Sequence, residues 1–453
     1  MISLLFCADF QAFAVILLNC FKVLLCLLAN FTNFRKITPT PEMGFELLFY
    51  FTLFEDNNNG LPKLSLKDRR RRDRRTPRIA ILHYNKSSFH YLFQSGDDQA
   101  LLNCCGVDHK VFRSLLAIFE PSFHYYMVDE ETGRIRKRTF TRHGLPKGRT
   151  RHVTPTCCLG LVLFWYRTRG SVARATAMAF GLTSTPLYKW LKFGRRILLG
   201  MLHKHPLAKV SLPSPEELQS YIVAIGNKYQ VLQRERVWGA ADGLKLRLQQ
   251  STDWAIQNKY YNGWTGGTYV NSVFVFAPDG RIRIATINAP GTFHDSTMAD
   301  YGVYEKMGRL FKDFKVKVVV DSAFNLKDVN CLIKSSQKDP MDKGAHGVRL
   351  NRAATSVRQL SEHGMRMIQG QFPRLKDPLT YEEFGERKVI LNLMVVLYNF
   401  QTSTVGINHI LNSFMSNTKG FKSYDAAKEF RGRTTPFHSY PQRIDANAND
   451  VFI

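Results

Sequence analysis

The chain has 453 residues, of which 44% are hydrophobic and 22% charged, the balance of a globular protein with two or three domains. Its net charge of +26 exceeds what solubility requires, because balanced charge would serve solubility as well, so we expect a polyanionic partner, most simply DNA. The eight cysteines include no Cys-x-x-Cys pair, which argues against a zinc site and a secreted disulfide framework.

Residues 1–75 are atypical, and we expect them to be disordered or foreign to the rest of the chain. Residues 10–29 are nearly all apolar, but Lys22 lies among them and no basic residue precedes them, so they make a poor signal peptide and a poor membrane span. We favour an extension without a membrane role, and a membrane tether is the alternative. Residues 67–75 form a basic block typical of nuclear localisation, of nucleic-acid contact or of a solvated charge run, and we expect a nuclear protein.

Residues 76–234 are expected to be mostly helical. Within them, 79–130 is a small helical piece without an assigned role, and a second basic stretch follows at 134–152. Residues 155–200 show a helix, a glycine-containing turn, a short helix and a last helix that Pro186 opens. This order is the outline of a helix-turn-helix.

The last of these helices carries a basic face that could meet DNA phosphates. A plain helical bundle beside the next domain explains the pattern equally well, because helix-turn-helix outlines are common by chance. The residues that we expect to contact DNA are Lys189, Lys192, Arg195 and Arg196.

From residue 235 the pattern changes to that of an α/β domain, which we expect to span 235–405, with a polar and basic tail at 406–453. The predicted strands are 237–241, 269–276, 281–288 and 316–320. The predicted helices are 296–306, 324–334, 357–372 and 384–402. Three antiparallel strands followed by alternating helix and strand is the order of an RNase H-like core, a mixed sheet flanked by helices. In that topology the first and fourth strands lie side by side.

Three acidic residues of this domain stand where the fold could bring them to one point. Asp242 and Asp321 each end an apolar strand, and Glu362 lies on a later helix. Each has a plainer explanation alone: a turn for Asp242, a helix cap for Asp321 and a solvated surface for Glu362. Together they form an oxygen-ligand set of the kind that Mg²⁺ prefers, and two ions about 4 Å apart can act on both oxygens of a phosphodiester displacement.

Six short motifs follow one another through this domain. They are Gly-Ala-Ala-Asp-Gly at 239–243, Lys-Tyr-Tyr-Asn-Gly at 259–263, Pro-Gly-Thr-Phe-His-Asp-Ser at 290–296, Val-Asp-Ser-Ala-Phe at 320–324, the helix from Arg358 through Glu362 to Phe372, and Leu-Tyr-Asn-Phe at 397–400. Their sequences and order resemble the PIF/Harbinger family of DDE transposases and the nucleases derived from them. The resemblance covers about residues 155–405.

The resemblance implies a DDE-type endonuclease or transposase that cleaves DNA, with Asp242, Asp321 and Glu362 as its catalytic residues. These would hold two divalent ions, Mg²⁺ or Mn²⁺, and no small-molecule cofactor is expected. The family also implies a separate Myb-like partner protein that helps DNA binding. We choose Asp295 as a supporting metal carboxylate, with a helix N-cap as its alternative. Arg358 is expected to pair with Glu362 or to contact DNA phosphate.

The fourth motif departs from the family, which has glycine and tyrosine where this chain has Ala323 and Phe324. Phe324 lacks a hydroxyl that could form a hydrogen bond, and Ala323 disfavours a backbone conformation that glycine allows. A catalytically inactive, transposase-derived DNA-binding protein is therefore the alternative function.

The second motif combines basic and aromatic side chains. Lys259, Tyr260 and Tyr261 precede a glycine-rich turn at 263–267. The combination suits nucleic-acid contacts, although an ordinary hairpin surface would have the same composition.

Overall fold

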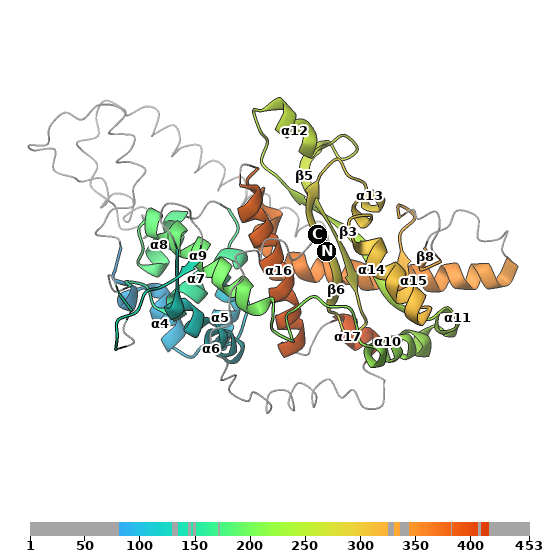
Figure 1. Cartoon of the computed structure of the whole chain (residues 1–453), viewed down its shortest axis with the longest axis horizontal. Coiled ribbons are helices and arrows are strands. Elements are labelled where there is room, and N and C mark those ends of the chain that lie inside the picture. The colour runs from blue at the N-terminus through green and yellow to red at the C-terminus, as the bar shows by residue number, and fades with distance from the viewer. Residues whose placement is uncertain are drawn as a thin grey trace, which may run out of the picture. The chain divides into compact units, whose positions relative to one another are not determined.

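A computed structural model describes residues 81–415 of the chain, except 129–134, 144–145, 148–150, 171–172, 325–329, 336–343, 382 and 406–408 (Figure 1). All described residues belong to one compact unit, Asp73–Ile453. The predicted N-terminal segment 1–75, with its apolar stretch and basic block, and most of the predicted tail 406–453 lie outside them. In the described part of the chain, no helix is both long and apolar enough to span a bilayer.

Helices dominate the described chain up to residue 234. Side-chain caps start several of them; Asp108, for example, accepts a hydrogen bond from the amide of Val111, and Ser214 forms a reciprocal capping box with Glu217. Two short strands, β1 and β2, which the sequence did not predict, pair with each other in antiparallel direction. The elements are η2 (Tyr84–Lys86), α4 (Ser88–Gln94), α5 (Asp98–Cys105), α6 (His109–Tyr125), β1 (Tyr126–Val128), β2 (Ile135–Lys137), α7 (Pro155–Arg167), α8 (Ala173–Phe180), α9 (Ser184–Leu202), α10 (Pro215–Lys228) and α11 (Gln230–Arg234).

One arginine of the basic stretch 134–152 is part of this helical core. The Arg151 guanidinium lies over the rings of Phe123, Trp190 and Phe193, at 4.6, 5.6 and 5.0 Å from their centroids. It also donates hydrogen bonds to two backbone carbonyls at the end of α6. Burial lowers the pKa of Arg151 to about 10. Arg151 therefore holds the helices together and is not available to DNA.

One mixed sheet forms the centre of the α/β part. Its path is β4-β5-β3-β7-β8, and β6 pairs with β5. β3 and β5 are antiparallel, as are β5 and β6, whereas β7 runs parallel to β3 and β8 parallel to β7. The first and fourth predicted strands, β3 and β7, thus lie side by side as expected. The strands are β3 (Val237–Arg247), β4 (Tyr261–Asn262), β5 (Gly267–Phe276), β6 (Ile282–Pro290), β7 (Lys317–Val320) and β8 (Leu332–Lys334).

Helices flank both faces of this sheet. Gly364 of α15 packs closely against the ring of Phe276: a Cβ added at this glycine would lie only 2.5 Å from a ring carbon. Phe276 pairs with Ala240 of β3, and side chains alternate along a strand, so Asp295 of α13, which lies over Gly243, is on the opposite face. This is the RNase H-like arrangement that the strand order predicts. The helices are α12 (Trp254–Tyr260), α13 (Asp295–Ala299), α14 (Val303–Phe314), α15 (Gly344–Gln371), η4 (Pro373–Lys376), α16 (Phe384–Val405) and α17 (His409–Phe414).

Two predicted helices differ from the observed elements. The prediction of a helix over 324–334 was wrong at its end, where Leu332–Lys334 form β8 and extend the sheet beside β7. A short apolar run fits either element, and here sheet pairing decides. The helix predicted at 296–306 is divided, because Gly302 takes a left-handed conformation with φ of 92° between α13 and α14.

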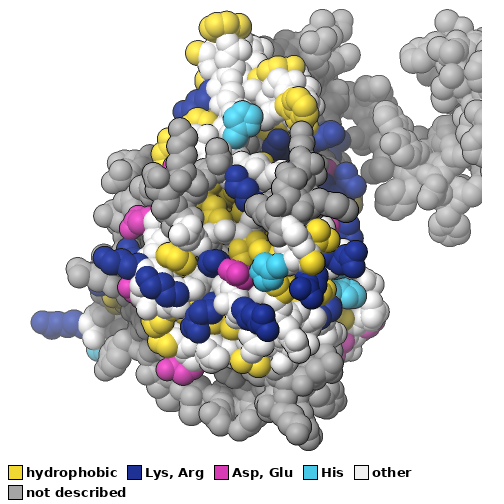
Figure 2. All heavy atoms as spheres, turned by 90° about the vertical axis from the view of Figure 1, so that its right-hand side faces the viewer, with side chains coloured by type: hydrophobic (Ala, Val, Ile, Leu, Met, Phe, Trp, Pro, Cys, Tyr) yellow, Lys and Arg dark blue, Asp and Glu magenta, His cyan; other side chains and the backbone are white. Residues whose placement is uncertain are grey.

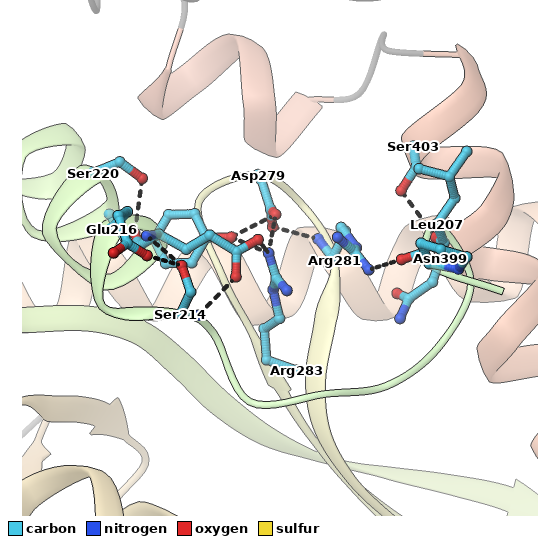
Figure 3. A network of polar contacts seen from close by, with 12 residues as sticks. Leu207, Ser214, Glu216, Ser220, Asp279, Arg281, Arg283, Asn399 and Ser403 are labelled. Carbon is cyan, nitrogen blue, oxygen red and sulfur yellow. Dashed lines mark hydrogen bonds and ion pairs between the residues drawn. The ribbon is translucent and has the colours of Figure 1, made fainter. Parts of the chain in front are cut away.

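A buried polar network fastens α10 to the turn between β5 and β6 (Figure 3). Arg283, only 3% exposed, donates to Glu217 at 2.7 Å and to Asp279 at 2.8 Å. The Tyr221 hydroxyl donates to Asp279 at 2.6 Å and receives a further hydrogen bond from Arg283. We call these four residues the hairpin cluster. It makes the β5–β6 turn a rigid part of the fold.

The sixth motif, at 397–400, binds the outer strand of the sheet. The Asn399 side chain accepts a hydrogen bond from the backbone amide of Ile282 at 2.8 Å and donates to its carbonyl at 3.0 Å. The Tyr398 hydroxyl donates to the carbonyl of Gly280 at 3.0 Å. α16 thereby satisfies backbone groups of β6 that no neighbouring strand pairs in the described part.

Candidate active site

The parallel pairing of β3 and β7 places Asp242 next to Asp321. Ala240 lies opposite Val319 in this pairing, so two residues further along both chains the two aspartates are neighbours. β7 ends at Val320, and Asp321 is the first residue beyond it, whereas β3 continues to Arg247. Both carboxylates are therefore at the carboxyl end of β7, half-buried against the sheet.

The charge of Asp242 is poorly compensated. Its pKa is raised to about 6, chiefly by burial and also by the negative charges of Asp295 and Asp321, against the opposing effects of the Gly243 amide and Arg358. Oδ1 of Asp242 accepts a hydrogen bond from the Gly243 amide at 2.8 Å, and Oδ1 of Asp321 accepts one from Ser322 at 2.7 Å. A cation placed between these carboxylates would relieve their repulsion.

Asp295 flanks this pair from the opposite face of β3. It lies over Gly243, where a Cβ would be 2.4 Å from its Oδ1, so the glycine after Asp242 makes room for it. Burial raises the pKa of Asp295, and the charge of Asp321 adds to the effect. The N-cap of α13 is His294 and no side-chain cap bond forms there, so the alternative of Asp295 as a cap is wrong.

Glu362 lies on α15 and is held by arginines. Its Oε1 is 2.7 Å from Nη2 of Arg358, and its Oε2 is 4.0 Å from Nη2 of Arg366. Arg358 also lowers the pKa of Asp242, so its charge acts on both sides of the candidate site. The expected pairing of Arg358 with Glu362 is confirmed, and its alternative role toward DNA phosphate stays a prediction.

The donor set fits a divalent ion only in part. Among the residues that the structure describes, no group of three or more His, Cys, Asp and Glu side chains is arranged to hold a metal ion. Asp242 and Asp321 supply two undercompensated carboxylates, and Mg²⁺ typically uses one or two protein carboxylates together with water and phosphate. Glu362 could join them once it exchanges Arg358 for the ion.

One predicted DNA contact is wrong. The sequence places Arg195 on an exposed basic face of α9, but the residue is only 4% exposed. Its guanidinium carbon lies 3.8 Å from the ring centroid of Trp165, and its Nη1 is 3.3 Å from Glu386 of α16. α9 packs against α16 on this side, and this tertiary contact converts a predicted surface into an interior.

The neighbouring basic residues of α9 meet the start of α16 and the residue before it. Lys192 is 2.9 Å from Glu383, and Arg196 is 3.3 Å from Glu386. Lys189 is exposed one turn earlier. The three helices of the helix-turn-helix outline are present, but much of the basic face of the last one is engaged within the protein. This favours the helical bundle over DNA recognition by α9.

The departures in the fourth motif do not distort the site. Phe324 is fully buried, and its amide donates to the Asp321 carbonyl at 3.2 Å. Ala323 is not among the described non-glycine residues with positive φ, which are Arg236, Asn288 and Lys315. Alanine is therefore compatible with this turn, and phenylalanine fills a core position that needs no hydroxyl.

Two further motifs meet beside Asp295, a connection that sequence reasoning missed. The Asn262 amide donates to the carbonyl of Gly291 at 2.7 Å. A Cβ on Gly291 would lie 2.3 Å from the Tyr260 carbonyl oxygen and 2.5 Å from that of Tyr269. Asn262 and Gly291 therefore fasten the second motif to the loop that carries Asp295. The sequence offered one sign of this contact: Asn262 and Gly291 belong to consecutive motifs, the second and the third.

Basic side chains surround this part of the molecule. Figure 2 shows Lys and Arg side chains gathered on the face over α14 and α15, with few acidic ones among them. The exposed basic residues of α14, its C-cap and α15 include Arg309, Lys312, Lys315, Arg349, Arg352 and Arg366. Such a surface favours binding of a polyanion by charge.

Comparison with known families gives a match that covers the candidate site. Residues 241–399 match a family model described as DDE superfamily endonuclease. The match includes Asp242, Asp321, Asp295 and Glu362, and it supports a metal-dependent nuclease domain with DNA as the substrate class. None of the curated proteins and none of the solved structures compared with the chain matches it.

Proposed function

We propose that this protein is a metal-dependent endonuclease of the PIF/Harbinger type that cleaves DNA phosphodiester bonds. The observation that carries the proposal is the parallel register of β3 and β7, which sets Asp242 beside Asp321 inside the region that resembles DDE endonucleases. The order of the six motifs supports the subfamily.

The protein side chains would act mainly by holding the metal ions and the DNA phosphate in position for the reaction. Asp242 and Asp321 would hold divalent cations, and Glu362 would complete the ligand set after leaving Arg358. Two such ions, when bound, activate water and neutralise the charge that develops on the phosphodiester. The water oxygen forms a bond to phosphorus, and the bond from phosphorus to the 3′ oxygen breaks, which frees a 3′-hydroxyl and leaves a 5′-phosphate. Arg358, released from Glu362, would lie near the phosphate and offset its charge.

The charge of the protein and its distribution along the sequence support DNA as the substrate and the nucleus as the location. A net charge of +26 and the basic face over α14 and α15 suit DNA as the substrate. We propose a nuclear location, in keeping with the basic block at 67–75. A Myb-like partner protein that contributes DNA binding belongs to the same proposal, since Arg195 and Arg196 of the basic face of α9 are engaged with Glu386 of α16.

A catalytically inactive DNA-binding protein is the second candidate. The observation that favours it is the ion pair between Arg358 and Glu362, which keeps the third carboxylate from the other two. The test is Mn²⁺ binding. If the wild type binds Mn²⁺ with micromolar affinity and Asp242→Ala does not, a protein that has lost its metal site is excluded.

The test is nicking of supercoiled plasmid by the full chain in Mg²⁺ or Mn²⁺. We expect the wild type to nick and Asp321→Asn to lose at least about 10³-fold in rate, because a carboxylate that holds the ions is gone. Asp313→Asn, an exposed carboxylate on α14, is the matched control and should nick normally. Nicking by Asp321→Asn at the wild-type rate would place the chemistry elsewhere. Inactivity of the wild type, with and without an added Myb-like protein, would favour the inactive binder.

A further inference from the structure

We propose that the outer end of the β3–β5 hairpin binds unpaired DNA bases by stacking them on exposed tryptophans whose backbone is held in place. This aromatic tip comprises α12, β4 and the turn 263–266, and it rests on the proposed function in that DNA is the partner. It lies at the end of the molecule where Figure 1 places α12, and hydrophobic side chains crown the same end in Figure 2.

The tip exposes large aromatic side chains to an unusual degree. Trp264 is 93% exposed and Trp254 is 79% exposed, and Tyr261 beside them is 44% exposed. Tryptophan is highly buried on average, and the Trp238 side chain in the sheet follows that rule with no exposure. Two highly exposed indoles at one end of the hairpin therefore indicate a binding surface.

The backbone around Trp264 is held in place by hydrogen bonds. The Asn262 side-chain oxygen accepts from the amide and the hydroxyl of Thr265, each at 3.1 Å, and so closes the turn around Trp264. The same side chain donates to Gly291, which ties the turn to the Asp295 loop. A ring whose backbone is already ordered loses little conformational entropy when a base stacks on it.

Trp254 is the first residue of α12, and hydrogen bonds also hold the backbone there. The Asp253 carboxylate accepts hydrogen bonds from the amides of Ala255 at 2.9 Å and Ile256 at 3.1 Å and so caps the helix. At the other end of α12 the buried Arg387 donates to the Tyr260 hydroxyl at 2.9 Å. The helix that carries Trp254 is therefore anchored at both ends.

The positive charge of the aromatic tip favours a polyanion, rather than another protein, as its binding partner. Lys245, Arg247 and Lys259 are exposed along the hairpin. Asp253 is the one acidic residue in the sequence from 245 to 267, so the segment carries three cations against one anion, and that carboxylate is engaged in capping. Exposed aromatic rings interleaved with cations are the pattern of surfaces that bind single strands without regard to sequence.

The strand register gives the distance from the tip to the candidate active site. The β3–β5 pairing continues from Asp242 and Phe274 outward to Arg247 and Tyr269. Five residues of strand span roughly 17 Å, or about five base-pair steps of DNA. Only a base that has left its stack presents a free face to an indole. The tip would therefore hold bases opened at least that far from the bond that is cut.

The experiment measures tryptophan fluorescence of the full chain during titration with a thymidine oligonucleotide, in EDTA so that cleavage plays no part. The wild type should be quenched as bases stack on the indoles. Trp264→Ala and Trp254→Ala should each weaken single-strand affinity roughly 5- to 150-fold, the range measured when a stacking aromatic is removed. Trp264→Phe should keep most of the affinity, and duplex affinity should change by less than about 3-fold.

The control is Tyr91→Ala, which removes an aromatic side chain that is 60% exposed on α4. The inference is overturned if the oligonucleotide does not quench the wild type, if both tryptophan variants bind it as tightly as the wild type, or if Tyr91→Ala weakens binding equally. If the protein nicks plasmid but the oligonucleotide does not quench its tryptophan fluorescence, base stacking is contradicted and the proposed cleavage stands. If the fluorescence is quenched but plasmid is not nicked, base stacking is supported and the proposed cleavage is contradicted.

Discussion

The hairpin cluster and the candidate active site use the same kinds of side chain with opposite results. In the hairpin cluster, Arg283 has Glu217, Asp279 and Tyr221 around it, and every one of these partners is within hydrogen-bond reach (Figure 3). In the candidate site, Asp242 faces the charges of Asp321 and Asp295, and Arg358 is bound to Glu362.

The difference appears in the pKa values of the two regions. Burial opposes the charge of Arg283, but Asp279, Tyr221 and Glu217 outweigh it, so the pKa of Arg283 is raised and its charge is secure. Burial and like charges raise the pKa of Asp242 to about 6, so its charge is costly. A compensated cluster stabilises geometry, whereas an undercompensated one stores repulsion that a bound cation can relieve.

The largest expected effect on stability is at the hairpin cluster. Arg283→Met should lower the free energy of unfolding by up to about 3 kcal/mol, because Asp279 and Glu217, whose side chains are 15% and 38% exposed, lose their counter-charge and solvent screens only part of the loss. Urea denaturation at pH 7 measures this. Adding Asp279→Asn to Arg283→Met should restore part of the loss, since the uncompensated charge is then removed as well. A loss below about 1 kcal/mol would mean that the cluster is not structural.

Asp242→Asn tests the opposite condition in the candidate site. The folded-state pKa of about 6 exceeds the ordinary value of 3.8, so the stability that this group contributes is full below pH 4 and is lost as pH rises through 6. Without metal, the variant should therefore be more stable than the wild type above pH 6, by up to about 3 kcal/mol, and the advantage should vanish near pH 4.

Thermal unfolding in EDTA from pH 4 to pH 8 measures this difference, with Asp313→Asn as the control that should show none. Mn²⁺ should raise the melting temperature of the wild type and leave Asp242→Asn unchanged, because binding to the folded state stabilises it by mass action. A difference between wild type and variant that stays constant with pH would contradict the raised pKa.

Arg358→Gln tests whether this arginine competes with metal for Glu362. Removing the competing cation should tighten Mn²⁺ binding about 10-fold, which corresponds to about 1.4 kcal/mol. Calorimetric titration of the two proteins with Mn²⁺ checks this, and Arg366→Gln, whose side chain is 74% exposed and 4.0 Å from Glu362, is the matched control. Weaker Mn²⁺ binding in Arg358→Gln would show instead that Arg358 orients Glu362 for the ion.

The smallest effect is expected at an exposed ion pair. Lys192 and Glu383 are 2.9 Å apart, but both side chains are about half exposed, at 44% and 49%. Lys192→Ala should change the free energy of unfolding by less than about 1 kcal/mol, because solvent and salt screen the pair. Urea denaturation at low and high salt measures it. A loss as large as that of Arg283→Met would show that exposure does not separate the two kinds of cluster.

Most of the strand order and the position of the two aspartates followed from local patterns. Apolar runs that end in Asp242 and Asp321 predicted two strands, the strand order placed these strands side by side, and β3 and β7 are neighbours as expected, with a parallel pairing that the structure adds. Local patterns failed where a residue's surroundings come from a distant segment. Arg195 has the spacing of a surface residue, yet α16 covers it from about 190 positions further along the chain.

The sequence by itself determined the order of the four predicted strands, the basic character and the set of carboxylates, because strand periodicity, charge and residue type are local properties. Tertiary structure alone decided which charges are compensated. It buried Arg195 beside Trp165, placed Asp295 over Gly243, and left Trp254 and Trp264 exposed at the hairpin end. The reason is physical: the free energy of a charge or an aromatic ring depends on the neighbours that the fold brings to it.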